Sequence, residues 1–170
     1  MKKFVSSLVL VFAISLAIGQ TSLIQDVPYF NQMCNSNNPT GTCQISSMAM
    51  VLKAYGATSI TPDYIYNNYD YSDAKDVPGW KNMFESLAQT YGLSVRSDSY
   101  TAGSVSQLRS ALAAGKPVTV HGYFTGGGHV IVIVGYDGSN YICQDPYGEW
   151  NEVYGGSYSS VYCGSTAGEY

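Results

Sequence analysis

Three residue types in this chain could together carry out nucleophilic catalysis: a cysteine, a histidine and a carboxylate. Cys43 stands where the polar run PTGT gives way to the apolar helical pattern QISSMAMVLKAYG. A thiol in the first turn of a helix faces the positive end of the helix dipole and free backbone N–H groups, which favour the reactive thiolate. Cys43 is therefore a candidate nucleophile. A buried core cysteine and a disulfide partner are the alternatives.

A cysteine nucleophile needs a base, and the chain has only two histidines. His129 follows the glycines 126–128 and begins the β-branched run HVIVIVGY, which places its imidazole at the mouth of a predicted strand. His121 lies inside the run VTVHGYF, where a structural role on a strand is expected. His129 is therefore the predicted base. The glycines before it suit either a substrate-facing loop or a plain hairpin turn.

A carboxylate that could orient this base follows the next predicted strand, in YICQDPYGEW. Asp145 there could hold the imidazole of His129 and stabilise the imidazolium. A simple four-residue turn, however, pairs Asp145 near Val132, about 10 Å along the strand from His129. A β-bulge, a longer turn or a bend at Pro146 is needed to bring the two together. Gln144 is a weaker substitute for the carboxylate.

The oxyanion that forms in acyl transfer needs hydrogen-bond donors. The backbone N–H of Cys43 is one candidate, and the side-chain amide of Gln32 is the other. Gln44, directly after the cysteine, is a rival amide. No metal or organic cofactor is expected, because two histidines in unlike settings do not make a zinc site.

The elements that must position these residues change character along the chain. A buried helix is predicted over Cys43–Tyr55, with Thr42 as its N-cap and Gly56 just past its end. Further helices are predicted from Thr61, over Trp80–Tyr91 and over Ser104–Ala114, and strands over Val118–Tyr123, His129–Tyr136 and Tyr141–Gln144, with shorter strands within 149–162. Helices first and an antiparallel sheet second predict the α+β class. Gln25–Phe30 fits a short strand or an extended lead-in segment.

The amino terminus is typical of a signal peptide over residues 1–19. Two lysines precede the uncharged apolar run Phe4–Ile18, which ends in the small-residue pattern Ala17-Ile18-Gly19. The run has 15 residues, whereas a membrane-spanning helix needs roughly 20. Cleavage leaves one domain, residues 20–170, and predicts a secreted protein, extracellular or periplasmic, without stable membrane association. An uncleaved membrane anchor is the alternative.

The net charge limits the classes of binding partner, and the cysteines indicate a disulfide. The net charge is −4, and it becomes −6 when Lys2 and Lys3 are removed with the signal peptide. An acidic chain without basic runs argues against nucleic acid or an anionic membrane as partner. A monomer is expected. Secreted chains usually pair their cysteines, so a disulfide is expected among Cys34, Cys143 and Cys163, with its connectivity open.

Three segments, VPYFNQ, NPTGTCQISSMAMVLKAYG and GKPVTVHGYFTGGGHVIVIVGYDGSNYICQDPYGEW, resemble in this order the motifs of papain-like cysteine peptidases. The resemblance is greatest to the branch related to the double-glycine leader peptidases of bacteriocin export, and it extends from Val27 to about Tyr158. It implies a helical lobe packed on a C-terminal antiparallel sheet, with the site in the cleft between them. It implies that Gln32 donates to the oxyanion and that Cys43 is the nucleophile. It also implies that His129 is the general base and acid and that Asp145 is the orienting carboxylate.

The chain departs from that branch in lacking a transporter domain and in carrying Gln144 where the branch often has Asn. Processing of an exported leader peptide is therefore not expected. The predicted function is a secreted cysteine peptidase that hydrolyses peptide or related amide bonds through an acyl-enzyme. Its substrate is a peptide or protein, with cell-wall peptide as one possibility. The alternatives are a non-catalytic binding module on the same fold, with a tyrosine-rich cleft, and an acyl transferase or deamidase.

Overall fold

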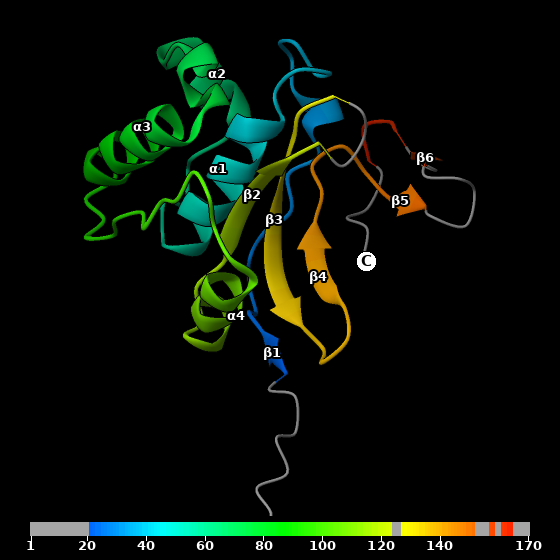
Figure 1. Ribbon diagram of the computed structural model, residues 1–170. Coiled ribbons are helices and arrows are strands. Elements are labelled where there is room, and N and C mark those ends of the chain that lie inside the picture. The colour runs from blue at the N-terminus through cyan, green and yellow to red at the C-terminus, as the bar shows by residue number, and fades with distance from the viewer. Residues whose placement is uncertain (1–20, 124–126, 152–156, 159–160, 165–170) are drawn as a thin grey trace, which may run out of the picture.

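The computed structural model describes residues 21–123, 127–151, 157–158 and 161–164 (Figure 1). The signal peptide expected over residues 1–19 lies outside these residues and stays a prediction. The fold is α+β, as predicted, with most helices before the strands of an antiparallel sheet. Within the described residues, no helix combines the length and the apolar character that a membrane crossing requires.

The helices and main strands lie where the sequence predicted them, to within three residues at every end that it predicted. The helices are α1 (Cys43–Ala54), α2 (Pro62–Asn68), α3 (Val77–Thr90) and α4 (Val105–Ala113), with 3₁₀ turns η1 (Gln32–Cys34) and η2 (Tyr71–Lys75). The strands are β1 (Ser22–Leu23), β2 (Val118–Gly122), β3 (His129–Tyr136), β4 (Tyr141–Gln144), β5 (Trp150–Asn151) and β6 (Ser157–Tyr158). The 3₁₀ turns and β1 were not predicted. The segment Gln25–Phe30 forms no strand, because Pro28 has no N–H to give to a ladder.

Side-chain caps explain where three of the helices begin. Thr61 accepts a hydrogen bond from the N–H of Tyr64, so α2 begins at the proline that follows Thr61. The side chain of Asp76 accepts from the N–H of Gly79, so α3 begins at Val77. This start is three residues before Trp80, where the sequence predicted it. Ser104 and Gln107 form a reciprocal capping box at the start of α4.

Strand β3 is the centre of the sheet. Strand β4 pairs with one edge of β3, and β2 and β1 pair end to end with the other edge. The edges must differ, because β4 lies opposite the same β3 residues as β1 and β2 do. One residue of β3 interrupts the regular pairing with β4. Ile133 lies opposite Cys143 and Gly135 lies opposite Ile142, so Val134 is an extra residue, a β-bulge.

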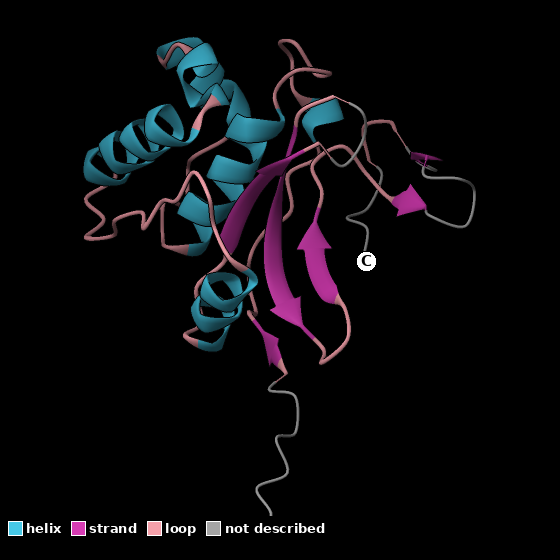
Figure 2. Ribbon diagram, in the orientation of Figure 1, coloured by secondary structure: helices cyan, strands magenta, loops and turns pink. Residues whose placement is uncertain are grey.

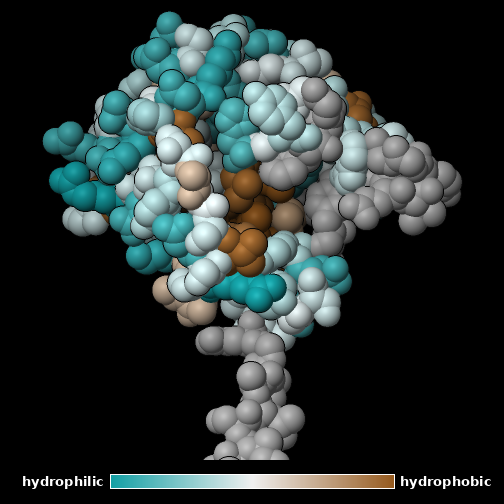
Figure 3. Space-filling view, in the orientation of Figure 1, coloured by the Kyte–Doolittle hydropathy of each residue, from teal (hydrophilic) through white to brown (hydrophobic). Residues whose placement is uncertain are grey.

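The two faces of the sheet pack against different helices. Helix α1 is buried along nearly its whole length, as expected, and packs with α2 and α3 against Val132 and Val134 of β3. On the other face, Ile133 packs with Leu112 of α4. Figure 2 shows α1, α2 and α3 gathered on one side of the strands, with α4 near β1. Figure 3 shows a strip of apolar surface over the central strands, bordered by more hydrophilic helices.

One disulfide joins the two ends of the described domain. Cys34, at the end of η1, is bonded to Cys163, 129 residues later in the chain. The predicted disulfide is thus confirmed, and Cys143 is the cysteine left over, buried on β4. In the chain-entropy account, closing a loop of this length stabilises the folded state by roughly 5 kcal/mol.

Candidate active site

Cys43 is the first residue of α1, where backbone N–H groups have no partner within the helix. Thr42 occupies the predicted N-cap position, but its hydroxyl does not cap the helix. It accepts instead a hydrogen bond from the amide of Asn35, at 2.8 Å. Thr42 therefore leaves the N–H groups of the first turn to other acceptors, and Cys43 lies at the positive end of the helix dipole.

The structure brings His129 and Asp145 together: Nε2 of His129 lies 2.6 Å from Oδ1 of Asp145. The bulge at Val134 explains how. Without it, Asp145 would lie opposite Val132 and point to the other face of the sheet from His129, because side chains alternate along a strand. With it, Gln144 lies opposite Val132. The register then places Asp145 opposite the next residue towards His129, on the face that His129 shares.

Both members of this pair are buried, with exposed fractions of 6% for His129 and 3% for Asp145. From the described residues, the carboxylate accepts three hydrogen bonds. Oδ1 accepts from His129 and from the backbone N–H of Tyr147 at 2.8 Å, and Oδ2 accepts from the hydroxyl of Tyr158 at 2.8 Å. A carboxylate with donors on both oxygens has a fixed orientation.

The environment of His129 favours the imidazolium. Burial by itself lowers the pKa of His129, but the hydrogen bonds to Asp145 and Cys43 and their negative charges outweigh burial and raise it to about 9. Nε2 is engaged by Asp145, so the other ring nitrogen, Nδ1, is the one left for the thiol. The thiol of Cys43 also lies 3.6 Å from Oε1 of Gln44, to which it donates.

Gln32 is 1% exposed and is held by one side-chain hydrogen bond and one backbone hydrogen bond. Its Nε2 donates to the carbonyl of Pro39 at 2.8 Å, and its backbone N–H donates to the carbonyl of Pro146 at 2.7 Å. The second bond ties η1 to the residue that follows Asp145. The rival amide, Gln44, presents its oxygen to the thiol of Cys43 and directs Nε2 at the carbonyl of Tyr71, so it is not poised as a donor there.

The remaining sequence candidates lie elsewhere. His121 is exposed on β2, opposite Val130. Gln144 donates to the carbonyl of Val27 at 2.6 Å and does not replace Asp145 as the partner of the histidine. Burial, and then the charge of Asp145, raise the pKa of the Cys143 thiol to about 12, so this second free cysteine is held as a neutral thiol.

Three tyrosines of the site were missed by sequence reasoning. The Tyr147 N–H is two residues from Asp145, the usual spacing of a side-chain turn, so the motif DPY could have indicated it. Tyr29 donates to the backbone carbonyl of Asp145. Burial, and then the negative charge of the Asp145 carboxylate, raise the pKa of Tyr29. Tyr158 reaches Asp145 from a distant segment, and no local pattern signals that contact.

A cysteine at the start of a central helix, beside a histidine and an aspartate from an antiparallel sheet, defines the class of papain-like cysteine peptidases. In a comparison with family models, the model of the Peptidase_C39 like family matches residues 24–167. The chain belongs to this family, which is one of cysteine peptidases. The particular relation to double-glycine leader peptidases stays a prediction. Comparisons with curated proteins and with solved structures gave no match.

The raised pKa of His129 predicts a pH-dependent stability. An ordinary histidine has a pKa of 6.5 and folded His129 has a pKa of about 9, so protonation favours the folded state. This contribution, at most about 3 kcal/mol, is present in full below about pH 6.5 and is lost as the pH rises to about 9. Urea unfolding over this range measures it, as the difference between wild type and His129→Gln. A difference that stays constant with pH would contradict it.

Proposed function

We propose that this chain is a secreted cysteine peptidase that hydrolyses peptide or related amide bonds through the triad Cys43, His129 and Asp145. The observation that carries the proposal is the position of His129. One ring nitrogen lies 2.6 Å from the buried Asp145 carboxylate, and Cys43 lies close enough to the imidazole to help raise its pKa. An imidazolium stabilised between a carboxylate and a thiolate is the resting state from which a cysteine nucleophile reacts.

In the proposed reaction the Cys43 thiolate attacks the carbonyl carbon of the scissile amide. The tetrahedral oxyanion accepts from the Cys43 N–H and from the amide of Gln32, whose Nε2 has a second hydrogen beside the one that it gives to Pro39. The imidazolium of His129 then gives its proton to the leaving amine as the carbon–nitrogen bond breaks, and the acyl-enzyme remains. Neutral His129 next takes a proton from water, which attacks the thioester and releases Cys43 and the carboxylic acid product.

Secretion is part of the proposal. The Cys34–Cys163 disulfide supports it, because disulfides persist in oxidising compartments outside the cytosol. The amino-terminal pattern of two lysines followed by an apolar run supports it as well. We propose a peptide or protein substrate, with cell-wall peptide among the candidates to be tested.

Alkylation by iodoacetamide near neutral pH, read by mass spectrometry, tests the nucleophile. We expect Cys43 to be labelled quickly in the native protein and Cys143 only after unfolding, because Cys43 is partly exposed and Cys143 is a buried neutral thiol. His129→Gln should slow the labelling of Cys43 by about tenfold or more, since the imidazolium partner is lost. A native protein in which reduced Cys43 stays unlabelled would contradict the proposal and would favour a non-catalytic binding module.

Product analysis separates hydrolysis from related acyl chemistry. The purified protein is incubated with peptides from a whole-proteome digest and with cell-wall peptides, and the products are sequenced by mass spectrometry. New amino termini that depend on Cys43 indicate a peptidase. Conversion of glutamine or asparagine side chains to acids would indicate a deamidase, and capture of an added amine would indicate a transferase.

A further inference from the structure

Tyr158 lies on β6, close to the carboxyl terminus, and makes a contact that no step of the proposed mechanism uses. Its hydroxyl donates to Oδ2 of Asp145 at 2.8 Å, while Oδ1 of that carboxylate is occupied by His129 and by the N–H of Tyr147. Two donors on one oxygen and one on the other leave the carboxylate a single orientation. Two side chains, those of His129 and Tyr158, therefore hold the two oxygens of the Asp145 carboxylate.

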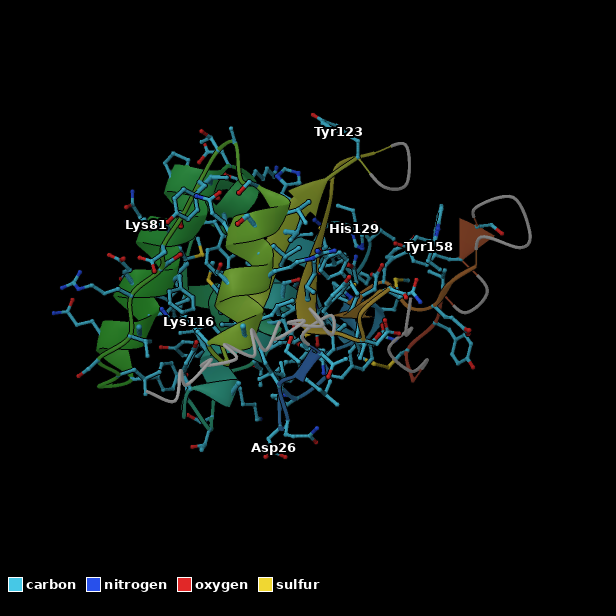
Figure 4. All side chains as sticks on the ribbon, turned by 60° about the horizontal axis from the view of Figure 1, so that its bottom comes forward. Asp26, Lys81, Lys116, Tyr123, His129 and Tyr158 are labelled. Atoms are coloured by element: carbon cyan, nitrogen blue, oxygen red, sulfur yellow. A yellow bond between two sulfur atoms is a disulfide. The ribbon has the colours of Figure 1, made fainter. Side chains whose placement is uncertain are left out.

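The ring of Tyr158 also covers the pair. Its centroid lies 6.1 Å from that of His129 and 4.9 Å from that of Tyr147, both in edge-to-face geometry, and Trp150 packs on it at 5.1 Å. Figure 4 labels His129 and Tyr158 on neighbouring parts of the molecule, well away from Lys81 and Lys116. Aromatic cover lowers the local dielectric, which strengthens the hydrogen bond between His129 and Asp145.

Tyr158 belongs to the short strand β6, which pairs with the two-residue strand β5. The segment just beyond it is fastened to the helical lobe at two points. Cys163 is bonded to Cys34, and the carbonyl of Tyr162 accepts from the amide of Asn31 at 3.0 Å. Both anchors lie at or beside η1, the turn that begins with Gln32. The two sides of the site are therefore joined covalently through this turn.

We propose that Tyr158 is a positioning residue for the triad, which fixes the Asp145 carboxylate towards His129, and that the Cys34–Cys163 disulfide holds it in place. The proposal rests on the proposed function, in which Asp145 stabilises the imidazolium. Without the hydroxyl, Oδ2 of Asp145 is a buried carboxylate oxygen that has lost its donor, and the carboxylate turns to find another. The pair with His129 then weakens, and the imidazolium is less stable.

Tyr158→Phe tests the hydroxyl and keeps the ring. We expect kcat to fall about tenfold, as is typical when a hydrogen bond that orients a catalytic side chain is removed. The alkaline limb of the pH–rate profile, which reports loss of the His129 proton, should move to lower pH. Tyr100→Phe is the matched control, because Tyr100 is 55% exposed and distant in sequence from every triad residue. It should leave both the rate and the profile unchanged.

A mutant cycle separates positioning from general stability. On an Asp145→Ala background, Tyr158→Phe should have no further effect on the remaining activity, because it acts through that carboxylate. The double variant Cys34→Ser/Cys163→Ser should lower kcat and shift the alkaline limb in the same direction, and adding Tyr158→Phe to it should change little. Unfolding by urea identifies variants that are not folded under the assay conditions, and Tyr158→Phe alone carries the test if the disulfide variant is among them.

A wild-type pH profile in Tyr158→Phe would overturn the positioning role, and so would a full tenfold loss on the Asp145→Ala background. Full additivity between the disulfide variant and Tyr158→Phe would overturn the anchoring role.

The rate at which iodoacetamide alkylates Cys43 in mildly acidic solution is a readout that needs no substrate, and it should fall in Tyr158→Phe. If Cys43→Ala hydrolyses as fast as wild type, the proposed function fails, whatever Tyr158→Phe does to alkylation.

Discussion

Replacement of Cys43 by alanine is expected to reduce peptide hydrolysis by about 10⁴-fold or more, because no other group can form the acyl-enzyme. The variant should stay folded. Cys43 is partly exposed at the first position of α1, and alanine is the best helix former, so the free energy of unfolding should change by less than about 1 kcal/mol. Initial rates on a cleaved peptide, with urea unfolding in parallel, measure both quantities.

Cys143→Ala is the matched control for this experiment. Cys143 is the other free cysteine among the described residues, and it is buried on β4 with its pKa raised to about 12. Its loss leaves a small cavity and lowers stability by about 1 kcal/mol or more, but the folded fraction should keep its activity. Hydrolysis that survives in Cys43→Ala and disappears in Cys143→Ala would show that the nucleophile has been wrongly assigned.

Replacement of Asp145 by alanine should have the second largest effect, a loss of about 10²–10³-fold in kcat. The imidazole of His129 loses the acceptor that orients it and the charge that stabilises its protonated form. Burial then lowers the pKa of His129 with only Cys43 left to oppose it, so that pKa should fall from about 9 towards its ordinary value. The alkaline limb of the pH–rate profile should move down with it. Stability should also fall, by about 1–3 kcal/mol for each buried donor left unpaired.

Asp145→Asn separates orientation from charge. The amide oxygen can still accept from Nε2 of His129, so the ring stays in place, but the negative charge is gone. We expect a rate between those of wild type and Asp145→Ala, with the alkaline limb shifted as in Asp145→Ala. A wild-type pH profile in Asp145→Asn would mean that the charge of Asp145 does not stabilise the imidazolium.

Local patterns were enough to predict most elements of this fold. The apolar run and stop signal of α1, the Thr61 cap and first-turn proline of α2, and the β-branched run of β3 each depend on residues that are neighbours in sequence. Of the two alternatives for Gln25–Phe30, the short strand is wrong, and β1 was missed. A two-residue strand has no period of its own, so only its pairing with β3 defines it. Thr42 occupies the predicted N-cap position, but its hydroxyl accepts from Asn35 and makes no capping bond.

The candidate site divides in the same way. The sequence alone singled out Cys43, His129, Asp145 and Gln32, because residue type and place at the end of an element can be read locally. The sequence alone did not predict that His129 and Asp145 meet. Their contact requires a register shift of one residue at the Val134 bulge, and a bulge depends on how two strands pack. Only the tertiary structure decided that register. It alone decided that Cys163 pairs with Cys34, and that Tyr158 reaches Asp145. Contacts between residues far apart in sequence are fixed by packing and chain closure, which leave no local pattern.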